Sequence, residues 1–250
     1  IDVWAGLARN SEIGINTFGG NENEINLALI KLKQRPKLVL DITALLTIHT
    51  LGIGASVVLA FGNPVVVQTT IDTISQKIQQ FKASEFRGGF MTLGKRQDHY
   101  IRDEVKPEDL RKNRRILENI LEWIFSNCVI EPCWASLKMN MNDKKELDEI
   151  IGVSFVDSAL VASQSEYVLY AEDAYLRTCV QNEPFFLTNS VWTQVVLLWL
   201  LAYGFINYQN YSEAVNIIDN QLNYGEVIFS PNTIASVAEQ LGWNPNEDFS

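Results

Sequence analysis

Short apolar runs of three or four residues alternate along this chain with longer segments that have helical spacing. The clearest runs cover residues 37–40, 65–67, 128–130 and 168–170, and a further one covers residues 185–187. Runs that are short and almost entirely apolar are typical of strands buried on both faces of a sheet. Their alternation with helices predicts an α/β fold, with a central, mainly parallel sheet and helices on both faces.

Apolar spacing and cap residues mark the expected helices. Pro107 opens a strongly amphipathic helix, and Asp143 with Glu146 has the spacing of a capping box. Residues 83–106 mix glycine, aromatic and charged residues without a sustained period, so we expect an insertion there, with a hairpin as one form of it. The expected helices cover residues 43–51, 69–81, 107–125, 143–151, 154–164, 174–180, 191–203, 212–222 and 231–241.

A chain of 250 residues is long enough for one large domain or for a domain with a sizeable extension. We divide it into an N-terminal extension (1–30), a main domain (31–187) with the insertion at about 83–106, and a C-terminal helical extension (188–250) that packs on the core. Because the chain begins at Ile1 without a methionine, we expect it to be part of a longer protein.

Composition favours a soluble globular protein, since 47% of the residues are hydrophobic and 20% are charged. The most apolar run, residues 195–206, is well short of the roughly 20 residues that span a bilayer, so we expect a buried helix and no membrane partner. Three cysteines without metal-ligand spacing indicate reduced thiols, and we expect a cytoplasmic protein. His49 and His99 have no partner at catalytic or zinc-binding spacing.

The net charge of −10 is distributed unevenly along the chain. Residues 31–115 contain 15 Lys and Arg against 8 Asp and Glu, whereas the rest of the chain contains 5 basic and 22 acidic residues. This asymmetry allows a basic face beside an acidic body, which is compatible with binding to a polyanion. The alternative is that the basic residues only solvate the surfaces of helices.

Four aspartates, Asp41, Asp72, Asp157 and Asp173, are the strongest candidates for chemistry. Asp41 and Asp173 follow apolar strands, and the carboxyl edge of an open α/β sheet is where ligands bind. Acids gathered there from distant positions repel one another unless a hard cation joins them, and Mg²⁺ takes one or two carboxylates with waters and phosphate oxygens. The pattern therefore points to metal-assisted phosphodiester chemistry.

Each of these acids also has an ordinary structural explanation. Asp41 is the firmest candidate, although an aspartate in this position also bonds its own backbone in a turn. Asp157 follows Ser154 at capping-box spacing, and Asp173 has the position of a helix cap. Asp72 is also explained as a surface charge near a helix N-terminus.

Two neighbouring residues are open to more than one interpretation. Thr43 is a candidate for orienting Asp41 or a metal-bound water, with ordinary helix capping as the alternative. Glu172 is expected to be an exposed neighbour of Asp173.

The chain resembles the PIN-like nuclease family in the order of several short segments. Residues 38–43 resemble the family's first-strand aspartate with its following Ser or Thr, residues 155–162 its helix start, and residues 168–177 its later strand and acidic turn. Residues 65–74 resemble its second strand and helix, and the likeness spans roughly residues 36–187. The resemblance implies that residues 31–187 form a PIN-like domain.

One departure from the family pattern concerns the second acid. The family usually places a glutamate where this chain has Thr73, with Asp72 beside it. Neighbouring helix positions point about 100° apart, so the family pattern does not place Asp72 on the metal. Ala171 also stands where family members often carry Ser or Thr.

The resemblance implies an endonuclease that uses one or two Mg²⁺ or Mn²⁺ ions, held by Asp41, Asp157 and Asp173, with Asp72 as a fourth candidate. It favours RNA over DNA as the substrate. Residues expected to neutralise backbone phosphates are Lys95, Arg96, Arg111, Arg114 and Arg115.

The alternative function is a non-catalytic PIN-like module that serves regulation or assembly within a larger multidomain protein. The imperfect second acid and the acidic C-terminal third favour this alternative. The expected partners are nucleic acid and other domains of the same polypeptide, and a homo-oligomer is left open.

Overall fold

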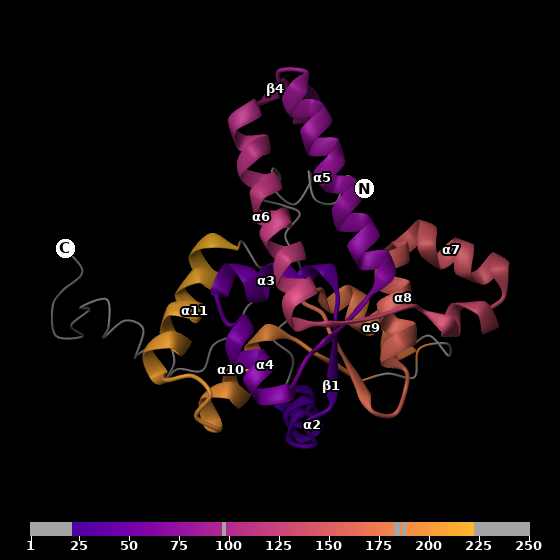
Figure 1. Ribbon diagram of the computed structural model, residues 1–250, viewed down its shortest axis with the longest axis vertical. Coiled ribbons are helices and arrows are strands. Elements are labelled where there is room, and N and C mark those ends of the chain that lie inside the picture. Colours follow the sequence, from indigo (N-terminus) through magenta and orange to yellow (C-terminus); the bar gives the residue numbers. More distant parts are fainter. Residues whose placement is uncertain (1–21, 97–98, 183–185, 187–188, 223–250) are drawn as a thin grey trace, which may run out of the picture.

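Five parallel strands form the centre of the computed structural model, which describes residues 22–96, 99–182, 186 and 189–222 (Figure 1). The strand order is β5-β2-β1-β6-β7. The central pair is in register from Lys37 opposite Tyr167 to Leu40 opposite Tyr170. The strands are β1 (Lys37–Leu40), β2 (Val65–Val67), β5 (Val129–Glu131), β6 (Tyr167–Tyr170) and β7 (Ser190–Val191).

Both faces of the sheet are buried, as the apolar runs predict. Leu38 and Leu40 of β1 pack into one hydrophobic cluster, and Val39 between them packs into the cluster on the opposite face. The first cluster is completed by α2 (Glu22–Lys33), α3 (Ile42–Leu51), α4 (Gly54–Phe61), α10 (Thr193–Ala202) and α11 (Tyr208–Gln221). The second is completed mainly by α8 (Val153–Ala162), with contributions from the 3-10 helix η1 (Trp134–Lys138), α7 (Met141–Ile151) and α9 (Ala174–Asn182). The predicted α/β fold, a parallel sheet flanked by helices, is confirmed.

A helical arm projects from the sheet and is the most conspicuous feature of Figure 1. It consists of α5 (Gln68–Phe86), an antiparallel hairpin of β3 (Phe90–Arg96) and β4 (His99–Val105), and α6 (Pro107–Asn127). The hairpin considered for residues 83–106 is therefore present. Near the sheet the arm helices bury apolar residues in the first cluster, whereas Phe86 at the far end is 93% exposed.

Ion pairs join the two arm helices in the part of the arm nearer the hairpin. Glu85 of α5 binds Arg111 (2.7 Å) and Arg114 (3.3 Å) of α6, and Arg114 also binds Glu118 at 2.8 Å. Lys82 of α5 lies 3.5 Å from Glu118. The four contacts form one network across the interface between α5 and α6.

Several elements differ from the sequence-based expectation. α4 is an additional helix, and α7 is capped by Asn140, which accepts a hydrogen bond from the Asn142 amide, instead of by Asp143. Most of the strand expected at 185–187 and all of the helix expected at 231–241 lie outside the described residues, and the edge position of the sheet is taken by β7.

Within the described ranges, no single helix is both long enough and apolar enough to cross a membrane. Among the described residues, only the pair of α3 and α4, with a bend of 114° between them, reaches that length and apolarity together. Much of the apolar surface of this pair is buried in the first cluster.

Candidate functional site

The strand order creates a switch point between β1 and β6. From β1 the chain continues to β2 and β5 on one side, and from β6 it continues to β7 on the other side. In open α/β sheets the crevice outside the carboxyl ends of two such strands is the usual ligand site. Asp41 immediately follows β1, and Glu172 and Asp173 follow β6, so three acids meet at this edge.

Asp41 is almost fully buried and bonded within its own turn. Its carboxylate accepts hydrogen bonds from the Ala44 amide (2.8 Å) and the Thr43 hydroxyl (2.8 and 2.9 Å), so it caps α3. Burial raises the pKa of Asp41 from 3.8 to about 7, against the lowering effect of these hydrogen bonds, and the negative charge of Asp173 adds to the rise. Asp41 therefore caps a helix and is at the same time a buried acid whose charged form is disfavoured.

The Thr43 hydroxyl connects the ends of the two central strands. It donates to Asp41 and accepts a hydrogen bond of 2.9 Å from the backbone amide of Glu172. A donor on one side and an acceptor on the other leave the hydroxyl with a fixed direction. Thr43 thus holds the Asp41 carboxylate in place relative to the turn after β6.

Glu172 is buried at 1% exposure, so the expectation of an exposed neighbour is wrong. Its carboxylate accepts from the Thr193 amide (3.2 and 3.4 Å) and from the Thr193 hydroxyl, which also bonds the Tyr170 hydroxyl at 2.6 Å. Burial raises the pKa of Glu172 to about 7, against Thr193 and the positive charge of Arg177, and Asp41 adds to the rise. A period of two continued past the strand end predicts this burial, because it places Glu172 on the same side as buried Tyr170.

Arg177 packs beneath the turn that carries Glu172 and Asp173. Its guanidinium donates to the carbonyls of Ala171 (3.1 Å) and Glu172 (2.5 Å) and lies 4.6 Å above the ring of Trp192. These contacts fix the backbone of the acidic turn. The positive charge of Arg177 offsets only part of the effect of burial on Glu172.

Asp173 is half-buried and caps α9. Its carboxylate accepts a hydrogen bond of 3.1 Å from the Leu176 amide, which is the cap role considered from the sequence. The charge of Asp173 nevertheless reaches Asp41 and contributes to the raised pKa of that carboxyl. The cap and the acid pair are compatible because a capping carboxylate retains further acceptor sites.

Asp157 projects from inside α8 and is 4% exposed. α8 begins at Val153 without a side-chain cap, so the capping-box explanation for Ser154 and Asp157 is wrong. One carboxylate oxygen of Asp157 accepts from the Thr69 hydroxyl at 2.9 Å, and the other lies 3.1 Å from the Lys144 ammonium. Thr69 comes from α5, which is distant in sequence, whereas Lys144 comes from α7, the helix directly before α8.

Asp72 does not join the other acids. It is exposed on α5 and accepts a hydrogen bond of 2.9 Å from Gln68. Thr73 donates to the backbone carbonyl of Thr69 (2.7 Å), and Thr69 is the α5 residue that bonds Asp157. On the α5 side, the residue that contacts Asp157 is therefore Thr69, which carries a neutral hydroxyl instead of an acid.

The expected phosphate-binding residues are in different situations. Arg111 and Arg114 are engaged with Glu85 in the arm network, whereas Arg115 is exposed. Lys95 and Arg96 belong to β3, and their side chains lie outside the part of the structure that is described.

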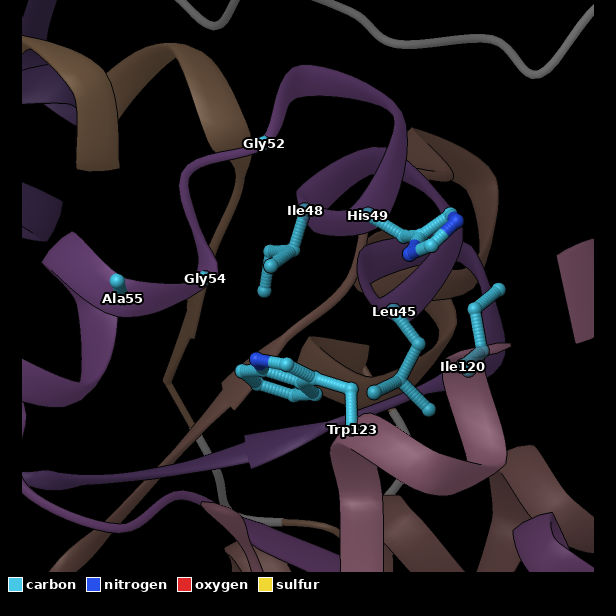
Figure 2. Close-up of a pocket in the computed structure, with 8 residues that line it drawn as sticks. All are labelled: Leu45, Ile48, His49, Gly52, Gly54, Ala55, Ile120 and Trp123. Atoms are coloured by element: carbon cyan, nitrogen blue, oxygen red, sulfur yellow. The ribbon is translucent and has the colours of Figure 1, made fainter. Parts of the chain in front are cut away.

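A separate apolar pocket of about 250 Å³ lies between α3, α4 and α6 (Figure 2). Its one titratable side chain is His49, whose pKa is lowered by burial. Gly54 lies so close to Trp123 that an added Cβ would be 2.8 Å from the indole nitrogen. The remaining lining residues are Leu45, Ile48, Gly52, Ala55 and Ile120.

The acids at the switch point are of the chemical type that binds Mg²⁺, but their side chains are not grouped around one position. Asp41 and Asp173 supply the oxygen ligands that Mg²⁺ prefers, and one or two carboxylates suffice when waters and phosphate complete the shell. Among the described residues, however, no three His, Cys, Asp or Glu side chains are grouped to hold a metal ion. Beside Asp157, the place where a cation would bind is next to the ammonium of Lys144, 3.1 Å from one carboxylate oxygen.

A family model for the PIN domain associated with the TPR-GreAB-C-PIN system matches residues 39–181. The chain belongs to this PIN domain family. The match covers more than half of the chain and includes all four candidate aspartates of this PIN domain. Comparisons with curated proteins and with solved structures gave no match.

Proposed function

We propose that this PIN domain is a metal-dependent endonuclease that hydrolyses phosphodiester bonds in RNA. The observation that carries the proposal is the Asp41 carboxyl, buried at the switch point with its pKa raised to about 7. A buried carboxylate near Asp173 and Glu172 is an unfavourable arrangement that a divalent cation relieves. Membership of the PIN family supports the same conclusion.

In this proposal Asp41 and Asp173 hold Mg²⁺ or Mn²⁺, and Asp157 joins them as the third ligand. A bound divalent ion supplies a water of lowered pKa and stabilises charge on the phosphate oxygens. Thr43 fixes the direction of the Asp41 carboxylate, and Arg177 fixes the turn that presents Asp173. Asp72 faces solvent beside Gln68, and we assign it no role in the site.

RNA as the substrate rests on the family resemblance. Arg115 on α6 is exposed and available for a backbone phosphate, whereas Arg111 and Arg114 must exchange Glu85 for phosphate before they contribute. We also propose that other domains of a larger protein are partners, because the family is described as part of a system that contains TPR and GreAB-C modules.

The direct test is Mn²⁺-dependent cleavage of a labelled single-stranded RNA, with the DNA of the same sequence in parallel. We expect Asp41→Asn and Asp173→Asn to lose activity by about a hundredfold or more. Asp72→Asn is the matched control, because it removes an acid of the same type outside the site, and it should cleave like the wild type. Equal cleavage by wild type and Asp41→Asn would overturn the role of Asp41.

The second candidate is a non-catalytic module for regulation or assembly. One observation favours it: the Lys144 ammonium lies 3.1 Å from one oxygen of Asp157 and would repel a cation bound there, while the Thr69 hydroxyl donates to the other oxygen. A wild-type protein that neither cleaves RNA nor binds Mn²⁺ would favour this function over the first.

A further inference from the structure

Lys144 of α7 places a positive charge next to Asp157, the candidate site acid that lies inside helix α8. Its ammonium nitrogen is 3.1 Å from Asp157 and 2.8 Å from Asp148, and the side chain of Lys144 is only 17% exposed. α7 lies beside α8 in Figure 1, so the lysine reaches Asp157 across the interface of two neighbouring helices. The Asp157 side chain is 6% exposed.

This contact places a positive charge beside the second oxygen of Asp157, which is buried and accepts no hydrogen bond from the described residues. Thr69 donates to one carboxylate oxygen at 2.9 Å, and Lys144 is adjacent to the other. A divalent ion bound to that second oxygen would lie within a few ångströms of the ammonium, and two positive charges at such a distance repel strongly at a buried site. Lys144 and a metal ion therefore exclude each other at Asp157.

Asp148 gives the lysine a second position. Lys144 and Asp148 are one turn apart on α7, and their contact does not depend on Asp157. If the ammonium moves away from Asp157, it keeps Asp148 as a carboxylate partner, and the incoming metal ion would balance the charge of the buried Asp157 carboxylate. The two acids thus define an engaged and a released position of one side chain.

We propose that Lys144 is an internal cation that competes with the metal ion at Asp157, so that metal binding requires its release to Asp148. The inference rests on the proposed metal-dependent function. It makes α7 the element through which metal occupancy is controlled.

The test is the affinity for Mn²⁺ of the full chain, measured by isothermal titration calorimetry without substrate. Lys144→Met keeps much of the length of the side chain and removes its charge, and we expect it to bind Mn²⁺ at least about tenfold more tightly. Lys145→Met is the matched control, because Lys145 pairs with Glu149 at 3.8 Å on the exposed side of α7. The control should bind within about twofold of the wild type.

A second variant tests the released position and keeps the lysine. Asp148→Asn removes the alternative partner, so Lys144 stays on Asp157 and Mn²⁺ binding should weaken several-fold. Thermal melts of each variant establish that it is folded before its affinity is compared.

The outcomes separate this inference from the proposed function. Equal Mn²⁺ affinity in wild type, Lys144→Met and Asp148→Asn overturns the competition and leaves the metal site standing. Absence of Mn²⁺ binding at millimolar concentration in the wild type and in Lys144→Met overturns the metal-dependent function itself.

Discussion

At the scale of single residues, the buried carboxyls of Asp41 and Glu172 govern the electrostatics of the strand ends. Each has its pKa raised to about 7 chiefly by burial, and the charge of Asp41 adds to the rise at Glu172. Thr43 links the two residues by donating to the Asp41 carboxylate and accepting from the Glu172 amide. The folded protein therefore favours the protonated form of these acids more than the unfolded chain does.

The first prediction concerns Asp41→Asn without metal. Because the folded pKa of Asp41 is raised from 3.8 to about 7, the free energy of unfolding falls as the pH rises through this interval and stays low above it. Asparagine retains the capping role and cannot ionise, so the variant should be more stable than the wild type by about 1–2 kcal/mol at pH 8, with a smaller gain at pH 5. Urea unfolding at both pH values measures this, and a less stable variant at pH 8 would contradict it.

The second prediction concerns the hydroxyl that Glu172 shares with Tyr170. Thr193→Val removes the group that bonds both residues, so we expect a loss of about 1–3 kcal/mol in the free energy of unfolding. Thr178→Val is the control, because Thr178 is exposed on α9 and its hydroxyl donates to the helix carbonyl of Ala174. If both variants lose the same free energy of unfolding, the buried bonds of the Thr193 hydroxyl contribute no more to stability than those of an exposed hydroxyl.

The sequence identifies candidate site residues where they lie close after readable strands. Asp41 and Asp173 are of this kind, since the apolar runs before them define the strand ends. The partners of Asp157 were not predicted, because Thr69 lies 88 positions away and its contact depends on how α5 and α8 pack. Lys144 was missed because nothing in its local sequence separates it from Lys145, and its contact with Asp157 depends on how α7 packs on α8.

At the scale of secondary-structure elements, local periodicity identified the arm helices but not every core helix. α5 and α6 have one buried face and one polar face, which is the pattern that helical spacing detects. α4 was missed because its eight residues, from Gly54 to Phe61, are apolar on almost every position. α10 is equally apolar but was predicted, because its apolar run is too long for a strand, whereas the eight residues of α4 give no such length signal.

The third prediction concerns the joint between α5 and the β3–β4 hairpin. Gly89 has φ +98°, and a Cβ there would lie 2.3 Å from the carbonyl oxygen of Val105. Gly88 has φ +84° with no atom within 4 Å of such a Cβ, so Gly88→Ala carries only the cost of its backbone conformation. We expect Gly89→Ala to be less stable than Gly88→Ala by about 1–2 kcal/mol.

Hydrogen exchange of the β3–β4 amides, together with chemical unfolding, measures this difference. Faster exchange confined to the hairpin in Gly89→Ala would place the strain at the joint. Equal behaviour of the two alanine variants would show that the backbone at residue 89 shifts without cost.

At the scale of the whole molecule, the parallel topology was predictable although the strand order was not. Alternating strands and helices restrict the connections to crossovers that yield parallel neighbours. The position of β1 between β2 and β6 depends on contacts between distant segments, which no local pattern contains. The switch point and its acids follow from that order.

The fourth prediction is that Mn²⁺ raises the melting temperature more at pH 8 than at pH 5.5. A ligand that binds only the folded state stabilises it by mass action, and protons compete with the ion for Asp41 below its raised pKa of about 7. Asp41→Asn should show a reduced Mn²⁺ shift at pH 8. A shift of the same size at both pH values, unchanged by the substitution, would show that the ion stabilises the protein elsewhere.

The pairing of β1 with β6 has a consequence for how the chain folds as it is synthesised. Leu38 lies opposite Val168, so the central pair joins residues 130 positions apart, whereas α5 and α6 are joined through the hairpin between them. Contacts distant in sequence form slowly because a long loop must close before they are made. A ribosome therefore releases the arm well before the segment that completes the sheet. During that interval the arm segment is complete, but the edge of β1 that pairs with β6 has no partner. An unpaired strand edge favours aggregation, so this is the stage at which chaperone binding matters most.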